Sequence, residues 1–288
     1  MKVSVIGGAG RMGRWLATHF LNQGHEVTIS DINLDEAEAA ARVMGVNPAK
    51  SNVDAVQGAE LIVVSTPIEV TPKVLMEIAS HINRSAVIME ISSLKSRVVP
   101  VLEKIAQRGV KTVSVHPLFG PGAEGTVNEK VALIPISDPS SELQLAKTFF
   151  PGADLIVVEA EEHDKAMALT LSLPHFLNIA FGSVIGEENL ETLKKLGGTT
   201  FALQLILCEG VMTENPELYA SIQMSNEYTT QYLEKFLSRA KTLMQHISKK
   251  DAKRFAQMYA DTRSLLLKDS AFASAYEKMY RALKALQR

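Results

Sequence analysis

The chain has 288 residues, of which 46% are hydrophobic, and a formal net charge of −2 at pH 7. Its basic residues are scattered rather than clustered, so the chain lacks the electrostatic footprint of a nucleic-acid-binding protein and we expect no such partner. We also expect no apolar run to reach the roughly 20 residues that span a bilayer, and the N-terminus enters a strand-like run without a signal sequence. These features predict a soluble, cytoplasmic protein without membrane contact.

The first predicted element is a β-branched strand over residues 3–6, and a glycine pattern follows it. The pattern is Gly8-x-Gly10-x-x-Gly13, which places three residues without a Cβ where the pyrophosphate of a dinucleotide approaches the backbone. Residues 11–23 carry apolar side chains at helical spacing. Strand, tight turn and helix therefore follow one another, and the helix dipole favours a phosphate at its N-terminus.

The second predicted strand, over residues 26–30, ends at Asp31. Asp31 lies 18 positions beyond Gly13, about where an acidic residue reaches the ribose hydroxyls of the adenosine. A carboxylate there repels a 2′-phosphate, so we expect NAD rather than NADP. The alternative is that Asp31 only caps the helix that begins near Leu34.

Strands and helices continue to alternate after Asp31. We expect helices over 34–44, 70–81 and 98–107, and strands over 61–65, 86–91, 112–115, 131–136 and 154–158. Alternating elements with uniformly apolar strands indicate a Rossmann-type, doubly wound, mostly parallel sheet. We assign this NAD-binding domain to residues 1–160.

The strand-like runs disappear beyond about Glu161, and we expect residues 161–288 to form an all-α domain. Segments such as 229–246 and 250–268 carry apolar residues at three- and four-residue spacing, which require a partner surface. Another subunit can supply that surface, so we expect a homodimer joined through this domain. Cys208 is the only cysteine and has apolar neighbours, which predicts a core thiol.

The carboxyl ends of parallel strands form the ligand-binding edge of such a sheet, so residues just after each strand are the site candidates. The candidate cofactor residues are Gly8, Gly10, Arg11, Met12, Gly13, Asp31, Ser65, Thr66 and Pro67.

His116 directly follows a predicted strand and precedes a turn-rich loop. An imidazole with an ordinary pKa near 6.5 can take a hydroxyl proton as a hydride leaves the same carbon, so His116 is the candidate catalytic base. The alternative is a structural histidine that holds the loop.

Ser93 and Lys95 share the loop after another predicted strand. Ser93 either orients the imidazole or the substrate oxygen through a hydrogen bond, or it only caps the next helix. Among the serines of this loop, the capping role fits Ser96 best. Lys95 either neutralises a substrate carboxylate or is solvated. His175 lies on an apolar helical face, where a lone histidine is usually a core residue. The remaining histidines show no metal-ligand spacing, so we expect no metal.

Together these motifs resemble the prephenate dehydrogenase family, the NAD-linked enzymes of tyrosine biosynthesis that include arogenate and cyclohexadienyl dehydrogenases. The resemblance rests on segments in family order: 7–13 (GGAGRMG), 65–71 (STPIEVT), 92–95 (SSLK), 116–121 (HPLFGP), 173–176 (LPHF) and 216–219 (PELY).

This resemblance implies that His116 accepts the proton of the ring C4 hydroxyl while hydride passes to NAD, and that loss of CO2 then aromatises the ring. It implies that Ser93 supports this histidine, that His175 lines the substrate pocket, and that the protein is a dimer joined through its helical domain.

The sequence departs from the family in one stretch, where an arginine usually binds the substrate side-chain carboxylate. Ala202 occupies this place, and no arginine occurs between Arg108 and Arg239. Gln204 lies in the same stretch and is included among the candidate substrate-binding residues.

Two other functions remain open. A β-hydroxyacid-type dehydrogenase would use a lysine of the helical domain, with Lys165 and Lys194 as candidates. A non-catalytic, NAD(H)-responsive regulatory protein would keep the glycine pattern and lack the arginine.

Overall fold

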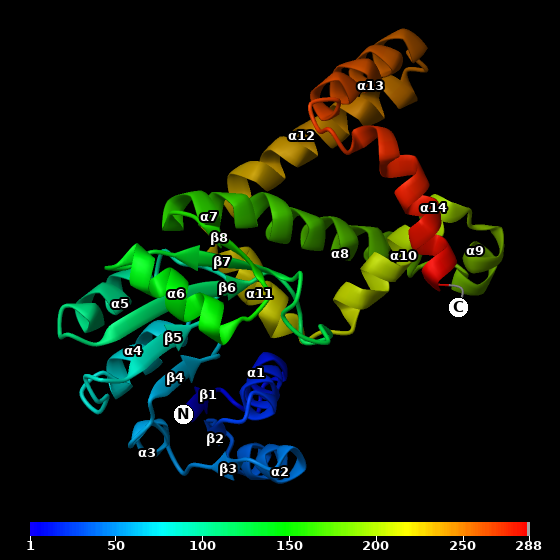
Figure 1. Ribbon diagram of the computed structural model, residues 1–288. Coiled ribbons are helices and arrows are strands. Elements are labelled where there is room, and N and C mark those ends of the chain that lie inside the picture. The colour runs from blue at the N-terminus through cyan, green and yellow to red at the C-terminus, as the bar shows by residue number, and fades with distance from the viewer. Residues whose placement is uncertain (287–288) are drawn as a thin grey trace. The chain divides into compact units, whose positions relative to one another are not determined.

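The computed structural model describes residues 1–286 and contains two compact units (Figure 1). The first unit comprises residues 1–167 together with Met224–Asn226, and the second comprises residues 168–223 and those from Glu227 onward. The composition change near residue 160 falls at the first residue of helix α7 (Ala160–Met167), and the first unit extends to the end of that helix.

An eight-stranded sheet in the order β3-β2-β1-β4-β5-β6-β7-β8 forms the centre of the first unit. All neighbouring strands are parallel except β6 and β7. The strands are β1 (Lys2–Ile6), β2 (Glu26–Ser30), β3 (Asn47–Pro48), β4 (Leu61–Val64), β5 (Val87–Glu90), β6 (Lys111–Pro117), β7 (Lys130–Ile134) and β8 (Asp154–Val157). The predicted doubly wound, mostly parallel sheet is confirmed.

Helices cover both faces of this sheet, which is why its central strands are apolar on both sides. Residues of α1, α2 and α6 join one buried cluster, which includes Phe20 and Val5. Residues of α3, α4 and α5 join the other, which includes Leu75 and Ile62. These helices are α1 (Arg11–Asn22), α2 (Leu34–Met44), α3 (Asn52–Val56), α4 (Thr71–Ile78), α5 (Val99–Ala106) and α6 (Pro139–Phe149).

The strand order reverses at the β1–β4 pair, because the chain adds β2 and β3 on one side and β4 to β8 on the other. In doubly wound sheets this switch point opens a crevice at the carboxyl ends of the strands, where ligands bind. The loops after β1 and β4, which begin at Gly7 and Ser65, meet at this switch point.

The second unit is helical. It consists of a π-helical turn (Ala168–Ser172), α8 (Leu173–Ile185), α9 (Leu190–Leu196), α10 (Thr199–Met212), α11 (Pro216–Ser225, whose last two residues belong to the first unit), α12 (Thr229–Ser248), α13 (Ala252–Leu266), a 3₁₀ turn (Phe272–Ser274) and α14 (Ala275–Leu286). Helices α8 and α10 pack closely: a Cβ on Gly182 would lie 2.7 Å from the sulfur of Cys208. Cys208 is buried, as predicted.

Many large apolar side chains of this unit are exposed in the single chain. Leu207, Met244, Tyr259 and Leu265 are examples, with 59%, 58%, 67% and 65% of their surface exposed. No residue of α13 or α14 within the described chain is buried.

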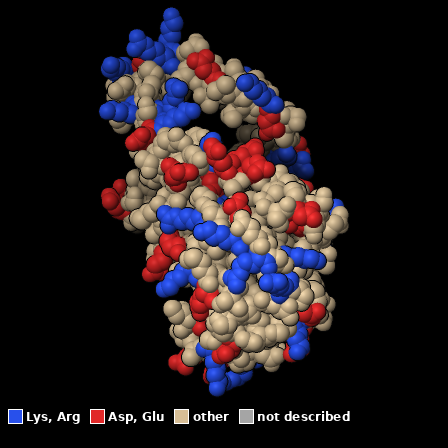
Figure 2. All heavy atoms as spheres, turned by 90° about the vertical axis from the view of Figure 1, so that its left-hand side faces the viewer, with Lys and Arg blue, Asp and Glu red and all other residues tan. Residues whose placement is uncertain are grey.

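Two expectations from the sequence need correction. The first is that no apolar run reaches the length that spans a bilayer. The helical run Ala160–Ile185 is long and apolar enough to cross a membrane by length and composition, because its last 20 residues contain no charged side chain. The basic residues are not all scattered either: Lys249, Lys250, Lys253 and Arg254 gather at the turn between α12 and α13, visible at the top of Figure 2. Asp251 pairs with Arg254 inside this group.

Candidate active site

The glycine pattern forms the turn between β1 and α1, and its glycines have different reasons to lack a Cβ. Gly7 has a φ of +78°. A Cβ on Gly8 would lie 2.5 Å from Cβ of Ile29, and one on Gly13 would lie 2.0 Å from the carbonyl oxygen of Gly7. A Cβ on Gly10 would meet nothing closer than 3.4 Å. The protein's own packing therefore requires Gly8 and Gly13 but leaves Gly10 space that an approaching ligand can use.

Helix α1 begins at Arg11 and has no side-chain cap. An uncapped N-terminus offers its backbone N–H groups and the positive end of the helix dipole to an anion. The candidate residues Arg11 and Met12 form this first turn, so the turn fits the pyrophosphate of a dinucleotide.

Asp31 lies at the carboxyl end of β2, beside the glycine turn. Its Oδ2 accepts a hydrogen bond from the backbone N–H of Ala9 at 3.1 Å. Helix α2 is capped by Asn33, whose side chain accepts from Glu36 N, so Asp31 is not the N-cap of that helix. Its carboxylate is available to ribose hydroxyls at the edge of the turn.

The loop after β4 contributes Ser65, Thr66 and Pro67 to the other side of the crevice. The side-chain hydroxyl of Thr71, which is fully buried, donates to the carbonyl oxygens of Thr66 and Pro67 at 3.0 Å each. These bonds tie the loop to the first turn of α4 and hold the three residues next to Gly7, whose Cβ position would collide with Ser65 O.

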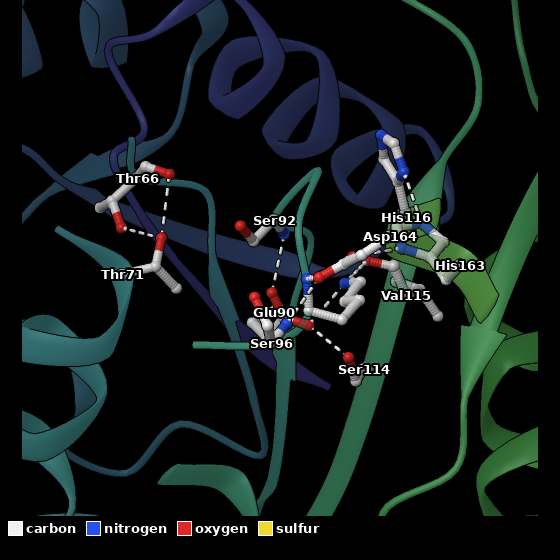
Figure 3. A network of polar contacts seen from close by, with 11 residues as sticks. Thr66, Thr71, Glu90, Ser92, Ser96, Ser114, Val115, His116, His163 and Asp164 are labelled. Carbon is white, nitrogen blue, oxygen red and sulfur yellow. Dashed lines mark hydrogen bonds and ion pairs between the residues drawn. The ribbon is translucent and has the colours of Figure 1, made fainter. Parts of the chain in front are cut away.

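A buried polar network begins at the end of β5 and reaches His116 (Figure 3). The carboxylate of Glu90 is its first member. It accepts from Ser92 N at 2.7 Å, from the Ser114 hydroxyl at 2.5 Å and from the ammonium of Lys95 at 2.7 Å. Lys95 also donates to Val115 O at 2.7 Å.

The expected role of Lys95 in binding a substrate carboxylate needs correction. Its side chain has no exposed surface, and its ammonium is held by Glu90 and Val115. Burial lowers the pKa of Lys95, while the neighbouring Glu90 carboxylate opposes that change. The lysine is a structural partner inside the unit, because its long side chain reaches inward rather than to the surface.

Asp164 of α7 continues the network. Its carboxylate accepts from the backbone N–H groups of Lys95 and Ser96, at 2.9 Å each. Ser96 is therefore held by its backbone, and the expectation that it caps the next helix is wrong: α5 begins at Val99 without a side-chain cap.

His163 connects Asp164 to His116. Asp164 Oδ1 lies 2.8 Å from His163 Nδ1, and His163 Nε2 lies 3.0 Å from His116 Nδ1. All three residues are buried. In Figure 3 the His116 ring stands at the end of this chain, with its second nitrogen pointing away from His163.

The surroundings keep both histidines neutral. Burial holds the pKa of His116 well below its ordinary value of 6.5, and the nearby His163 and Lys95 lower it further. Burial also lowers the pKa of His163, and the hydrogen bond that His163 donates to Asp164 opposes this change. Burial raises the pKa of Asp164, but its hydrogen bonds with His163, Ser96 and Lys95 outweigh this effect and the pKa is lowered. A neutral imidazole at the carboxyl end of β6 can accept a proton at pH 7.

Ser93 is half-buried in the loop between Ser92 and Lys95. Within residues 1–286 the structure records no hydrogen bond of its hydroxyl, and the recorded partner of the His116 ring is His163. Direct support of the imidazole therefore comes from His163, and the Ser93 hydroxyl is left for another partner.

The remaining candidates lie in the second unit. The ring of His175 meets Tyr219 edge-on at 4.5 Å, and its Nδ1 is buried without a partner in the part of the chain that the structure describes. Burial lowers the pKa of His175. Gln204 on α10 donates to the side chain of Asn178 on α8 at 2.7 Å, so it ties these two helices together.

Comparison with protein families places this chain in a known group. Residues 16–153 match the nucleotide-binding domain of prephenate dehydrogenase, and residues 159–261 match the dimerization domain of the same enzyme. The chain belongs to the prephenate dehydrogenase family.

The chain is also similar in sequence to individual curated proteins. The chain is 27% identical over 264 residues to a probable arogenate/prephenate dehydrogenase of Methanocaldococcus jannaschii, a match that covers 90% of this chain and 59% of that protein. It is 27% identical to a 4-amino-4-deoxyprephenate dehydrogenase of Streptomyces pristinaespiralis, over 91% of this chain and 90% of that one.

The solved structure of a prephenate dehydrogenase from A. aeolicus, in complex with hydroxyphenyl propionate and NAD⁺, has the same fold. The TM-score is 0.74 at 20% identity, and the match covers 93% of this chain and 98% of that one.

Sequence reasoning missed Glu90, His163 and Asp164. Glu90 had a signal, because a carboxylate inside the apolar strand Val87–Glu90 needs a buried partner. His163 and Asp164 follow Glu159, Glu161 and Glu162, which resemble a solvated helix face. Their partners lie 47 to 69 residues away in the sequence, so only the fold brings them together.

Proposed function

We propose that this chain is an NAD-dependent dehydrogenase of tyrosine biosynthesis. It oxidatively decarboxylates prephenate or arogenate to 4-hydroxyphenylpyruvate or tyrosine, with release of CO2 and NADH. The observation that carries the proposal is a neutral, buried imidazole, His116, at the ligand-binding edge of a Rossmann sheet in a chain of this family. Family membership supports both the enzyme class and the cofactor.

The cofactor fits the crevice at the switch point. The pyrophosphate would lie over Gly8, Gly10 and the first turn of α1, and the carboxylate of Asp31 would accept hydrogen bonds from the adenosine ribose. Ser65, Thr66 and Pro67 would flank the cofactor on the β4 side. Bound NAD⁺ supplies the hydride acceptor.

His116 moves the proton. Its Nε2 takes the proton of the C4 hydroxyl as the hydride leaves C4, which turns C4–OH into a carbonyl. The bond between the ring and its carboxylate then breaks, CO2 leaves, and the electron pair aromatises the ring. The ring oxygen recovers its proton from His116, so the residue ends each turnover neutral. Ser93 would hydrogen-bond the reacting oxygen.

The helical unit carries the remaining substrate-binding candidates and the surface expected to bind a second subunit. His175 has a buried ring nitrogen without a recorded partner, and we assign it and Gln204 to substrate binding. The exposed apolar side chains of this unit, together with the match to a dimerization domain, support a homodimer. We assign the protein to the cytoplasm as a soluble enzyme.

The structure gives little support to the lysine of a β-hydroxyacid-type enzyme. Lys165 and Lys194 are exposed and form ion pairs with Glu161 and Glu209. The regulatory alternative is supported by Ala202, which stands where the family carries its arginine.

The test is to incubate the protein with NAD⁺ and, in parallel, with prephenate, arogenate and 4-amino-4-deoxyprephenate. NADH absorbance and CO2 release are followed together. We expect both products to form in equal amounts with at least one of the first two substrates, and to be lost in His116→Asn. Tight NAD binding without turnover of any of the three would replace the enzyme by the regulatory protein.

A further inference from the structure

The chain Asp164–His163–His116 has a fixed direction. A carboxylate only accepts hydrogen bonds, so the 2.8 Å contact requires a proton on His163 Nδ1. A neutral imidazole protonated at Nδ1 is an acceptor at Nε2. The 3.0 Å contact then requires His116 Nδ1 to donate to His163 Nε2. His116 carries its proton on Nδ1, and its Nε2 lone pair is free.

Asp164 can set this direction because its own position is fixed. The backbone N–H groups of Lys95 and Ser96 donate to its carboxylate. The side chain of Asn226, which is 5% exposed, donates to the carbonyl oxygen of Asp164 at 2.8 Å. The loop after β5 therefore holds the carboxylate of Asp164, and the segment before α12 holds its backbone.

We infer that His163 and Asp164 are positioning residues that hold His116 in the tautomer whose Nε2 accepts the substrate proton. The inference rests on the proposed function, which makes His116 the base. Without the hydrogen bonds from His116 to His163 and from His163 to Asp164, a neutral His116 would populate both tautomers. One of these carries its proton on Nε2, the nitrogen that must accept the substrate proton.

The hydrogen-bonded series Asp164–His163–His116 also suits the protonated state of His116. When Nε2 of His116 takes a proton, Nδ1–H already donates to His163, which in turn donates to the anionic Asp164. The imidazolium therefore needs no rotation, and the charge of Asp164 faces it through one neutral ring.

The first measurement needs neither substrate nor activity. ¹⁵N-labelled histidine side chains report by NMR which ring nitrogen carries the proton, and the His116 signals are assigned by their loss in His116→Gln. At pH 7.5 we expect an unprotonated Nε2 on both His116 and His163. A proton on Nε2 of His116 in the wild-type protein would overturn the inference, whatever the substrate assays give.

Asp164→Asn reverses the chain without changing its shape. The N–H groups of Ser96 and Lys95 can both donate to an amide oxygen at the Oδ2 position, which lies 2.9 and 3.2 Å from them. The amide NH2 then takes the Oδ1 position, faces His163 Nδ1 and donates to it. His163 then donates from Nε2 to His116 Nδ1, which puts the His116 proton on Nε2. We expect kcat to fall about 10³-fold or more, with KM within about threefold of wild type and the His116 NMR tautomer inverted. A kcat within about threefold of wild type with an unchanged tautomer would contradict the assignment.

A pair of His163 variants separates positioning from packing. The carboxamide oxygen of Gln in His163→Gln can accept from His116 Nδ1, whereas His163→Ala offers no acceptor. We expect the Gln variant to keep at least about tenfold more kcat than the Ala variant, and His81→Gln, at an exposed histidine of the same unit, to match wild type. Equal loss in both His163 variants, with the wild-type His116 tautomer retained in both, would show that the residue only packs.

Discussion

The ammonium of Lys95 lies 2.7 Å from the carboxylate of Glu90, and neither side chain has any exposed surface. A buried ion pair adds little stability in itself, because removing both charges from water offsets their attraction. Removing one partner is different, because the other charge stays buried. The pair also connects β5 to β6, since Lys95 donates to Val115 O just before His116.

Lys95→Met should therefore lower the free energy of unfolding by about 3 kcal/mol or more, because it leaves the Glu90 carboxylate without its counter-ion. Urea denaturation measures this loss. The double variant Lys95→Met/Glu90→Gln should recover part of it, since no buried charge remains. The matched control is Lys195→Met, which breaks an exposed pair with Glu191 and should change stability by less than about 0.5 kcal/mol. An equal effect of Lys95→Met and Lys195→Met would refute the buried-pair argument.

The same residues show how far sequence reasoning reached. The mostly parallel sheet and the glycine turn follow from local patterns of apolar runs and glycine spacing. His116 was expected directly after a strand over 112–115, but it lies inside β6, where it is paired with Ala132 of β7. The direction of the Lys95 side chain does not follow from local patterns, because a lysine in a loop can reach either solvent or a buried carboxylate. The buried carboxylate of Glu90 draws the Lys95 side chain inward, and this contact depends on how β5 and the following loop fold together.

His163 and Asp164 were beyond sequence reasoning for another reason. Apart from their contact with each other, His163 binds His116 of β6 and Asp164 binds the loop after β5, both far away in the sequence, and neither residue lies in a recognisable motif. The loop position of Ser93 and the family resemblance both suggested that Ser93 supports His116, whereas the structure records His163 as the hydrogen-bond partner of the His116 ring. Spacing along the chain identifies residues at one edge of a sheet, but it does not select the hydrogen-bond partners among them.

The lowered pKa of His116 makes a prediction about pH. Protonation removes the base, so kcat/KM should stay constant through neutral pH and fall only below the folded-state pKa, which lies under the ordinary 6.5. A pH profile of kcat/KM measures this limb in the free enzyme. An acid limb centred at or above 6.5 would contradict the buried, neutral imidazole.

The free energy of unfolding should also fall as the pH is lowered. Between the folded pKa and 6.5 the unfolded chain binds more protons at His116 than the folded chain, so its contribution to stability is complete above 6.5 and is lost as the pH falls. The His163 pKa is lowered as well and acts in the same direction. The urea midpoint should fall on acidification from pH 7 to pH 5, and His116→Gln should reduce the fall.

Asp31 predicts cofactor preference. Its carboxylate stands beside the glycine turn and is not needed to cap α2, a role that belongs to Asn33. Asp31→Ala removes both the ribose hydrogen bonds and the repulsion of a 2′-phosphate. The ratio of kcat/KM for NAD⁺ over NADP⁺ should therefore fall about tenfold or more. A ratio equal to wild type would mean that Asp31 does not contact the ribose.

Two glycines of the turn, Gly10 and Gly13, should differ in what an added Cβ disturbs: the fold at Gly13 and cofactor binding at Gly10. Gly13→Ala would force a Cβ to within 2.0 Å of Gly7 O, so the turn must shift and the melting temperature should fall. Gly10→Ala meets no atom closer than 3.4 Å, and Gly10 has φ −66° and ψ 160°, which alanine adopts readily.

Gly10→Ala should therefore keep the melting temperature of wild type and weaken NAD⁺ binding by about tenfold or more, because the added methyl group occupies the space for the pyrophosphate. Calorimetry and NAD⁺ titration measure the two effects separately. Gly125→Ala, with nothing near its Cβ position, is the control and should change neither. If Gly10→Ala binds NAD⁺ as wild type does, the pyrophosphate does not lie over this turn, and the cofactor site must be sought elsewhere along the strand ends.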